Sequence, residues 1–493
     1  MQSPSRPPDQ GEYHDRIKRV ARAFIDDAVQ VLTEERVLAT SVYRRFIAVG
    51  TDYQGGSLMY LDTFKAFEQI LLQSYPAKFA DPLTSRDPQF PITYIFSFLE
   101  AFIARSGFEC TYSSESKGFE ESFIEMINLL DSNKYEIICC REVSHLATVE
   151  NLAVEFGDIS VIPRVESQNL TIDKFVPGAR SAFNGVEPRI YNPPLALINI
   201  RTSAESQNPY LLVDSLSAKI DKFLLILRLL YSTTAESHWQ VTGTSTLVSP
   251  MSPVYEQYRK EWLGPALIRR SIQLSAEHKQ AIENIQDMLS HVQIARNGIV
   301  TSSFDLALER FQRTFAYGNP FDKIVDLCIA LEAILIGDGN ENDGISLRLK
   351  NRASALLRTD NDSAPAIFND IAIFYVLRSR IVHGGQIKTK DLNKSIRKIS
   401  TVPEVGLFGT ATALAVDRLQ DLVRRGILAR LCLASEPDPL WPFDAQKSID
   451  SLLSDSDTQS QWRNHWHQKM ADIGACKSAG KSSPAIDSLS RDI

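Results

Sequence analysis

An arginine and a histidine five residues apart, Arg378 and His383, stand near the end of an apolar stretch that two glycines follow. The stretch predicts a helix that the glycines terminate, because glycine adopts the backbone conformation that ends helices. His383 then lies in the last turn, where the helix dipole favours a protonated imidazole, and Arg378 lies about 7.5 Å further back along the axis. A permanently charged guanidinium beside a titrating imidazole suits phosphodiester chemistry. Arginine stabilises the charge that builds on phosphorus, and histidine moves a proton.

Four blocks of helical pattern surround this pair, and their order and spacing are more specific than the arginine-to-histidine spacing alone. They are residues 304–317, 326–335, 347–357 and 375–384. Together they resemble the HEPN domain of the ApeA-like group, a family of helical ribonuclease and RNA-binding modules found in toxins and antiphage defence proteins. The resemblance covers roughly residues 300–435, a little over a quarter of the chain.

The resemblance implies a helical bundle that forms a homodimer, in which two copies of the R-x4-6-H motif build a composite site. Arg378 and His383 match that motif as the catalytic pair, and Glu332 matches an acidic position that orients its basic residues. The implied reaction is metal-independent RNA cleavage by attack of the ribose 2′-hydroxyl, with no cofactor. The residue after the motif arginine is commonly Asn, Asp or His in active members, whereas this chain has Ser379 there.

The same residues also have a structural interpretation. In that alternative His383 only caps its helix, and Arg378, or Arg352 in its place, forms an ion pair with Glu332. The corresponding alternative function is a catalytically inactive HEPN module that binds RNA or a protein partner. A test of RNA cleavage with a His383→Ala control distinguishes the two, because the fold alone does not decide function.

The charge of the chain is unevenly distributed. The net charge is −7, which argues against a surface that is basic throughout, but residues 345–435 contain 15 lysines and arginines against 7 acidic residues. A local charge of +8 attracts polyanions, although solvated helix faces give the same count. The supporting basic residues that we expect to contact RNA phosphates, or else to be solvated, are Arg380, Arg348, Lys350 and Arg352.

Hydrophobic periodicity predicts an α+β protein that is predominantly α-helical, with a C-terminal HEPN helical bundle preceded by an α+β N-terminal region. At 493 residues the chain exceeds one usual domain. We predict an N-terminal helical segment at 1–90, an α+β sensing or regulatory domain at 91–250, a helical connector at 251–300, the helical bundle at 301–435, and a polar, partly disordered tail at 436–493.

Individual elements follow from periodicity and turn residues. The pattern predicts strands at 135–140, 195–200 and 239–248, and a hairpin at 151–163 that turns at Gly157 and Asp158. Helices are expected at 13–32, 57–75, 92–104, 119–130, 214–231, 254–262, 276–291, 304–317, 320–336, 345–357, 364–382 and 411–433.

Several other kinds of site and location have no support. No apolar run reaches the roughly 18 residues of a membrane span, and the first sixteen residues are too polar for a signal peptide, so we expect a cytoplasmic protein without membrane contact. The six cysteines contain no CxxC pair. Residues 338–344 depart from a calcium loop at the glycine and at the twelfth position, and His465 and His467 lack further metal ligands. There is no phosphate-binding glycine-rich loop and no G-x-S-x-G motif.

Overall fold

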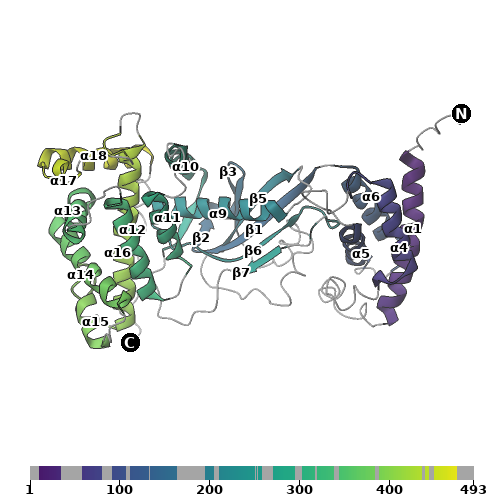
Figure 1. The fold of residues 1–493 in the computed structure, drawn as a ribbon, viewed down its shortest axis with the longest axis horizontal. Coiled ribbons are helices and arrows are strands. Elements are labelled where there is room, and N and C mark those ends of the chain that lie inside the picture. The colour runs from purple at the N-terminus through teal and green to yellow at the C-terminus, as the bar shows by residue number, and fades with distance from the viewer. Residues whose placement is uncertain are drawn as a thin grey trace. The chain divides into compact units, whose positions relative to one another are not determined.

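A computed structural model of the chain describes residues 10–34, 58–79, 91–106, 112–132, 134–163, 195–204, 210–249, 251, 254–257, 270–294, 302–316, 319–337, 344–383, 388–435, 439–442 and 449–474. The protein is predominantly α-helical with an α+β region, as the sequence predicts (Figure 1). It divides into two compact units, Met1–Glu142 with Glu155–Ile220 and His238–Tyr258, and Val143–Val154 with Asp221–Ser237 and Arg259–Ile493. Among the described helices, none is both long enough and apolar enough to cross a bilayer.

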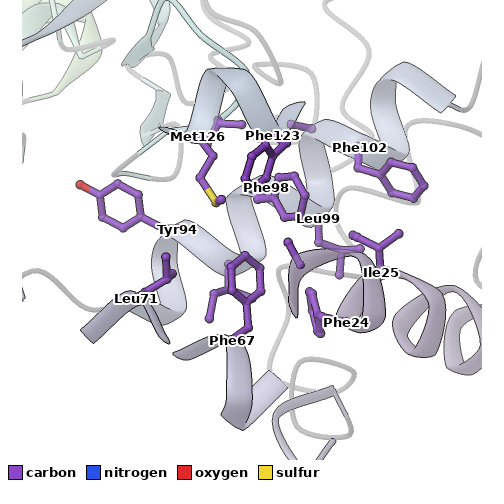
Figure 2. Close-up of a cluster of buried hydrophobic side chains, with 14 of the residues drawn as sticks. Phe24, Ile25, Phe67, Leu71, Tyr94, Phe98, Leu99, Phe102, Phe123 and Met126 are labelled. Carbon is purple, nitrogen blue, oxygen red and sulfur yellow. The ribbon is translucent and has the colours of Figure 1, made fainter. Parts of the chain in front are cut away.

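Four helices of the first unit pack around one aromatic core, which Figure 2 shows. They are α1 (Gln10–Glu34), α4 (Asp62–Ser74), α5 (Pro91–Ser106) and α6 (Lys117–Asp131). One chain of ring contacts crosses all four helices, from Phe24 to Phe67 (5.8 Å), to Phe98 (5.9 Å) and to Phe119 (5.7 Å). The helices before and after residue 90 therefore share a core. The domain limits that we drew from the sequence stay predictions.

The α+β part of the chain contains a six-stranded sheet with the order β3-β4-β5-β1-β6-β7. Strands β3 (Val154–Phe156) and β4 (Ile159–Pro163) are neighbours joined at Gly157, whose φ of 64° lies in the left-handed region that glycine adopts easily. This confirms the predicted hairpin. The remaining elements are β1 (Tyr135–Ser144), β5 (Leu195–Ala204), helix α9 (Tyr210–Tyr231), β6 (Glu236–Thr244) and β7 (Val254–Gln257).

One predicted helix is wrong at its start. Residues 254–257 form strand β7, which pairs antiparallel with β6 in the register Trp239 to Gln257, and residues 258–262 lie outside the described part. The segment Val-Tyr-Glu-Gln is rich in β-formers and completes the backbone hydrogen bonds of a sheet strand. Pairing with β6 therefore overrides a helical pattern that was only a few residues long.

The second unit contains a short parallel pair, β2 (Leu146–Thr148) with β8 (Ile272–Leu274), and a helical bundle. Part of the predicted polar tail forms helices α17 and α18, and α18 carries the buried Trp462 and Trp466. The elements are η2 (Val149–Asn151), η4 (Ala276–His278), α10 (Lys279–Ile294), α11 (Ser303–Arg313), α12 (Pro320–Leu335), α13 (Ile345–Leu357), α14 (Ala364–Val382), α15 (Thr389–Ile396), α16 (Phe408–Ala434), α17 (Ile449–Leu452) and α18 (Ser456–Asp472).

Candidate active site on helices α12 and α14

Helix α14 presents the arginine and the histidine. Ser363 caps its N-terminus by accepting a hydrogen bond from the Ala366 N–H, and a proline follows in the first turn. The helix ends at Val382, and the His383 N–H donates to the Ser379 carbonyl at 3.1 Å. The side chains that turn inward and fix the orientation of the helix are Ile367, Ile371, Phe374 and Leu377.

Glu332 on α12 holds Arg378. An Arg378 Nη donates to a Glu332 carboxylate oxygen at 3.2 Å, and the two side chains are 29% and 21% exposed. One turn earlier on both helices, the Cys328 thiol donates to the Phe374 carbonyl. Both contacts join residues 46 positions apart, so α12 and α14 run parallel here. The predicted partner of the motif arginine is in contact with it, which both the catalytic and the structural interpretations expect.

The surroundings of this ion pair are partly desolvated. Burial raises the pKa of Glu332 above its ordinary value, and the Arg378 cation opposes that rise. Burial also raises the pKa of the neighbouring Cys328 thiol to about 12, so the thiol is protonated at neutral pH. The Arg378 Nε is buried and has no hydrogen-bond partner within the described residues. The guanidinium therefore keeps donor capacity that Glu332 does not use.

His383 and its neighbours on the outer side of α14 are open to solvent. His383, Ser379 and Arg380 are all exposed. Arg378 and His383 are five residues apart, which corresponds to about 140° around a helix axis and about 7.5 Å along it. The two side chains thus leave the helix in different directions, one toward α12 and one at the exposed end. A phosphate that touches both must lie at the C-terminal end of α14, or must be shared with a second copy of the motif.

Two other predicted RNA contacts have a structural role. Arg352 is 4% exposed, and its three guanidinium nitrogens donate to Asp450 and to the Leu335 carbonyl. Arg348 donates to the same carboxylate at 2.7 Å. The hydrogen bond from Arg352 is the main cause that lowers the pKa of Asp450 below its ordinary value. We therefore correct the expectation for Arg348 and Arg352, because an acidic side chain already occupies the place of a phosphate.

Asp450 was not identified from the sequence. It lies 98 residues after Arg352, on the four-residue helix α17 within the predicted tail, and nothing in its local sequence indicates a partner. Lys350, the remaining predicted contact, lies over the Phe368 ring at 4.9 Å. Trp441, Trp462 and Trp466 all lie in the predicted tail, and all three are buried. Large apolar side chains in this segment were a sequence signal that it packs against the rest of the protein, and the sequence analysis did not use it.

Two further candidates that the sequence analysis set aside are residues 338–344 and the histidines near the C-terminus. Residues 338–343 lie outside the described residues, and Gly344 precedes α13 with a φ of 67°. His467 packs edge-on against Trp466. Burial is the main cause that lowers the pKa of His467, and the charge of the nearby Arg463 lowers it further. In the part of the chain that the structure describes, no three His, Cys, Asp or Glu side chains come together as a metal site.

Comparison of the chain with models of protein families, with curated proteins and with solved structures found no match.

Proposed function

We propose that the protein is a cytoplasmic endoribonuclease of the HEPN type that acts as a toxin or antiphage effector. The observation that supports this most directly is the state of the Arg378 guanidinium. Glu332 holds one of its nitrogens, while its Nε has no partner within the described residues, and His383 stands exposed at the end of the same helix. A cation that Glu332 orients, on the same helix as an accessible imidazole, suits transfer at a phosphodiester that lies at the end of α14 or is shared with a second copy.

In the proposed reaction the ribose 2′-oxygen attacks the adjacent phosphorus. Its proton passes to a base as the new bond forms, and the 5′-oxygen leaves with a proton from an acid. The products are a 2′,3′-cyclic phosphate and a 5′-hydroxyl end. His383 supplies proton transfer and Arg378 stabilises the negative charge on the phosphorane oxygens. Glu332 positions Arg378 and does not touch the substrate.

A homodimer supports this chemistry better than one copy. Attack by the 2′-hydroxyl needs a base on one side of phosphorus and an acid on the other, and one motif offers one titrating group. Helix α14 exposes Val376 (47%) and Val382 (58%) near the motif, about 120° apart around the helix axis. Exposed aliphatic residues next to a candidate site favour a self-complementary twofold contact. We infer that the working unit pairs two α14 helices.

The first prediction tests the catalytic pair. Expression of the wild-type chain should slow bacterial growth and deplete intact RNA, and Arg378→Ala or His383→Ala should abolish both effects. RNA integrity is measured on gels, and circular dichroism of the purified variants checks that they fold. Equal toxicity of the wild type and both folded variants would contradict the proposal. A protein that binds RNA but leaves it intact would support the inactive HEPN alternative.

The second prediction concerns the products. Cleavage of total RNA by the purified protein should persist in excess EDTA and leave 2′,3′-cyclic phosphate ends, because the proposed step uses an imidazole and a guanidinium. The ends are identified by mass spectrometry, with His383→Ala as the control for contaminating nucleases. Strict dependence on Mg²⁺, or 3′-hydroxyl ends, would show that another site performs the reaction.

A further inference from the structure

Two lysines of helix α15 and one that follows the helix are exposed. They are Lys390 and Lys394 on α15 and Lys398, two residues after the helix ends at Ile396; they recur every four residues, and we call them the basic stripe. Leu392 and Ile396 are buried. Each buried residue lies two positions from a stripe lysine, which is about 200° around the axis. The hydrophobic side therefore faces the bundle, and the basic stripe points directly away from it.

Several arginines of this region are buried, whereas the stripe lysines are exposed. Arg418 and Arg425 are buried and both bind Asp362, and Arg418 also binds Asp370. Arg352 is buried against Asp450. The charges of these three buried arginines are thus compensated by carboxylates of the bundle. The stripe lysines remain at the surface, where no ion pair involves them within the described residues.

The basic stripe lies close to the candidate active site along the chain. Helix α15 packs against α14 and α16 (Figure 1). Only the segment from His383 to Thr389 separates the end of α14 from α15. Six residues span at most about 21 Å even when fully extended. A strand of a few nucleotides therefore covers the distance from the exposed imidazole to the first stripe lysine.

The spacing of the stripe suits a phosphate chain. Lys390 and Lys394 are four helical residues apart, which corresponds to a rise of about 6 Å and is close to the repeat between phosphates in an extended single strand. Each lysine ammonium is a compact point charge on a flexible arm, so it binds phosphate without requiring a particular base. A row of such charges gives affinity that depends on salt and not on sequence.

We propose that the basic stripe, Lys390, Lys394 and Lys398, binds the backbone of single-stranded RNA and leads it to the end of α14. This inference rests on the proposed function, because it takes RNA as the ligand of that site. The stripe supplies binding, whereas Arg378 and His383 supply the chemistry.

A neighbouring exposed aliphatic surface raises the main alternative to RNA, which is binding to an anionic lipid membrane. Arg397 donates to the carbonyls of Pro403 and Gly406 and so fixes a loop on which Val405 is 82% exposed and Leu407 is 77% exposed. Two aliphatic side chains beside lysines also suit an anionic lipid surface. Aliphatic residues do not stack on bases as aromatic rings do. The regular lysine spacing next to the candidate site favours RNA, and lipid binding is a separate outcome of the test.

The experiment compares the full-length protein with the triple variant Lys390→Gln, Lys394→Gln, Lys398→Gln. The probe is a short fluorescent single strand in which every 2′-hydroxyl is methylated, so that it cannot be cleaved by 2′-hydroxyl attack. Fluorescence anisotropy over a range of salt concentrations gives the affinity and its salt dependence. Loss of three phosphate contacts should lower the log–log salt slope by about 2 and weaken binding about 100-fold near 0.1 M salt.

A matched control removes the same charge elsewhere, with Lys65→Gln, Lys117→Gln and Lys279→Gln on α4, α6 and α10. These lysines are 56%, 83% and 49% exposed. Unchanged binding by the stripe variant, or an equal loss in the control, would overturn the inference. So would stripe-dependent binding to phosphatidylserine vesicles without any effect on RNA. If RNA binding depends on the basic stripe but the protein cleaves no RNA, the inference about the stripe holds and the proposed ribonuclease function is refuted.

Discussion

At the scale of single residues, the candidate site depends on how an acid and a cation share a partly buried position. Arg378 lies between the Glu332 carboxylate, at 3.2 Å, and the ring of Tyr375, at 5.8 Å. Both neighbours restrict a side chain that would otherwise sample many conformations. Glu332 is ionised less readily than an ordinary glutamate because burial raises its pKa. The orientation of Arg378 is thus linked to the ionisation of one carboxyl group.

The third prediction follows from that link. Glu332→Gln should lower the rate of RNA cleavage about tenfold, because a misplaced guanidinium stabilises the transition state less well. Below its raised pKa Glu332 is neutral, and above it the carboxylate holds Arg378, so wild-type activity should rise with pH through that raised pKa. The rate of the Glu332→Gln variant should not show this rise with pH, which we call the acid limb of the pH profile. Rates measured from pH 4 to pH 8 check the expectation.

The control for this variant is Glu309→Gln, which changes an exposed glutamate on α11. It should keep both the rate and the acid limb of the wild type. If Glu332→Gln lowered the rate equally at every pH, Glu332 would have a structural role only and would not orient Arg378.

At the scale of elements, the ion pairs of the bundle connect helices that are far apart in the sequence. Asp450 on α17 accepts from Arg348 and Arg352 on α13, and Asp362 accepts from Arg418 and Arg425 on α16. Removing one partner of such a pair leaves the other charge buried and unpaired, which costs more than the pair itself contributes. The C-terminal helices are therefore part of the bundle.

The fourth prediction is that Asp450→Asn lowers the free energy of unfolding by about 2 kcal/mol at pH 7, since Arg352 loses its counter-charge. Arg352 holds the pKa of Asp450 below its ordinary value. The stabilisation is present above the ordinary aspartate pKa and is lost as the pH falls through the lowered one. The difference from wild type should close toward pH 3.

Urea unfolding followed by tryptophan fluorescence measures this difference, because Trp441 and Trp462 stack near α13 and α17. The exposed Asp360 gives the control variant Asp360→Asn, which should unfold like the wild type. A constant difference between pH 7 and pH 3 would contradict the role given to the Asp450 charge.

At the scale of the whole molecule, the sequence predicted the regular elements better than their long-range partners. Helix α14 follows from a cap, a proline and an apolar repeat, and the hairpin at Gly157 follows from one turn. Strand β7 was missed because its conformation depends on pairing with β6. The contact of Arg378 with Glu332 was anticipated, whereas Asp450 was not, because no local pattern marks an ion pair across 98 residues.

The fifth prediction concerns assembly. Light scattering should show a dimer at micromolar concentration, and the activity of mixed Arg378→Ala and His383→Ala subunits should depend on the mixing ratio. The reason is that the two side chains leave α14 about 140° apart, which suits a site that takes each from a different copy. No recovery at any ratio would exclude that sharing. A monomer whose specific activity is independent of concentration would exclude the dimer.

The packing of α18 has a consequence for the biosynthesis of the protein. Trp466 and Arg463 donate to the carbonyls of Leu356 and Ala355 at the end of α13, and Trp462 stacks on Trp441. A nascent chain cannot make these contacts until Trp466 has left the ribosome, so the bundle stays incomplete throughout translation of the preceding helices. The bundle that carries Arg378 and His383 therefore completes its packing only after α18 has been synthesised.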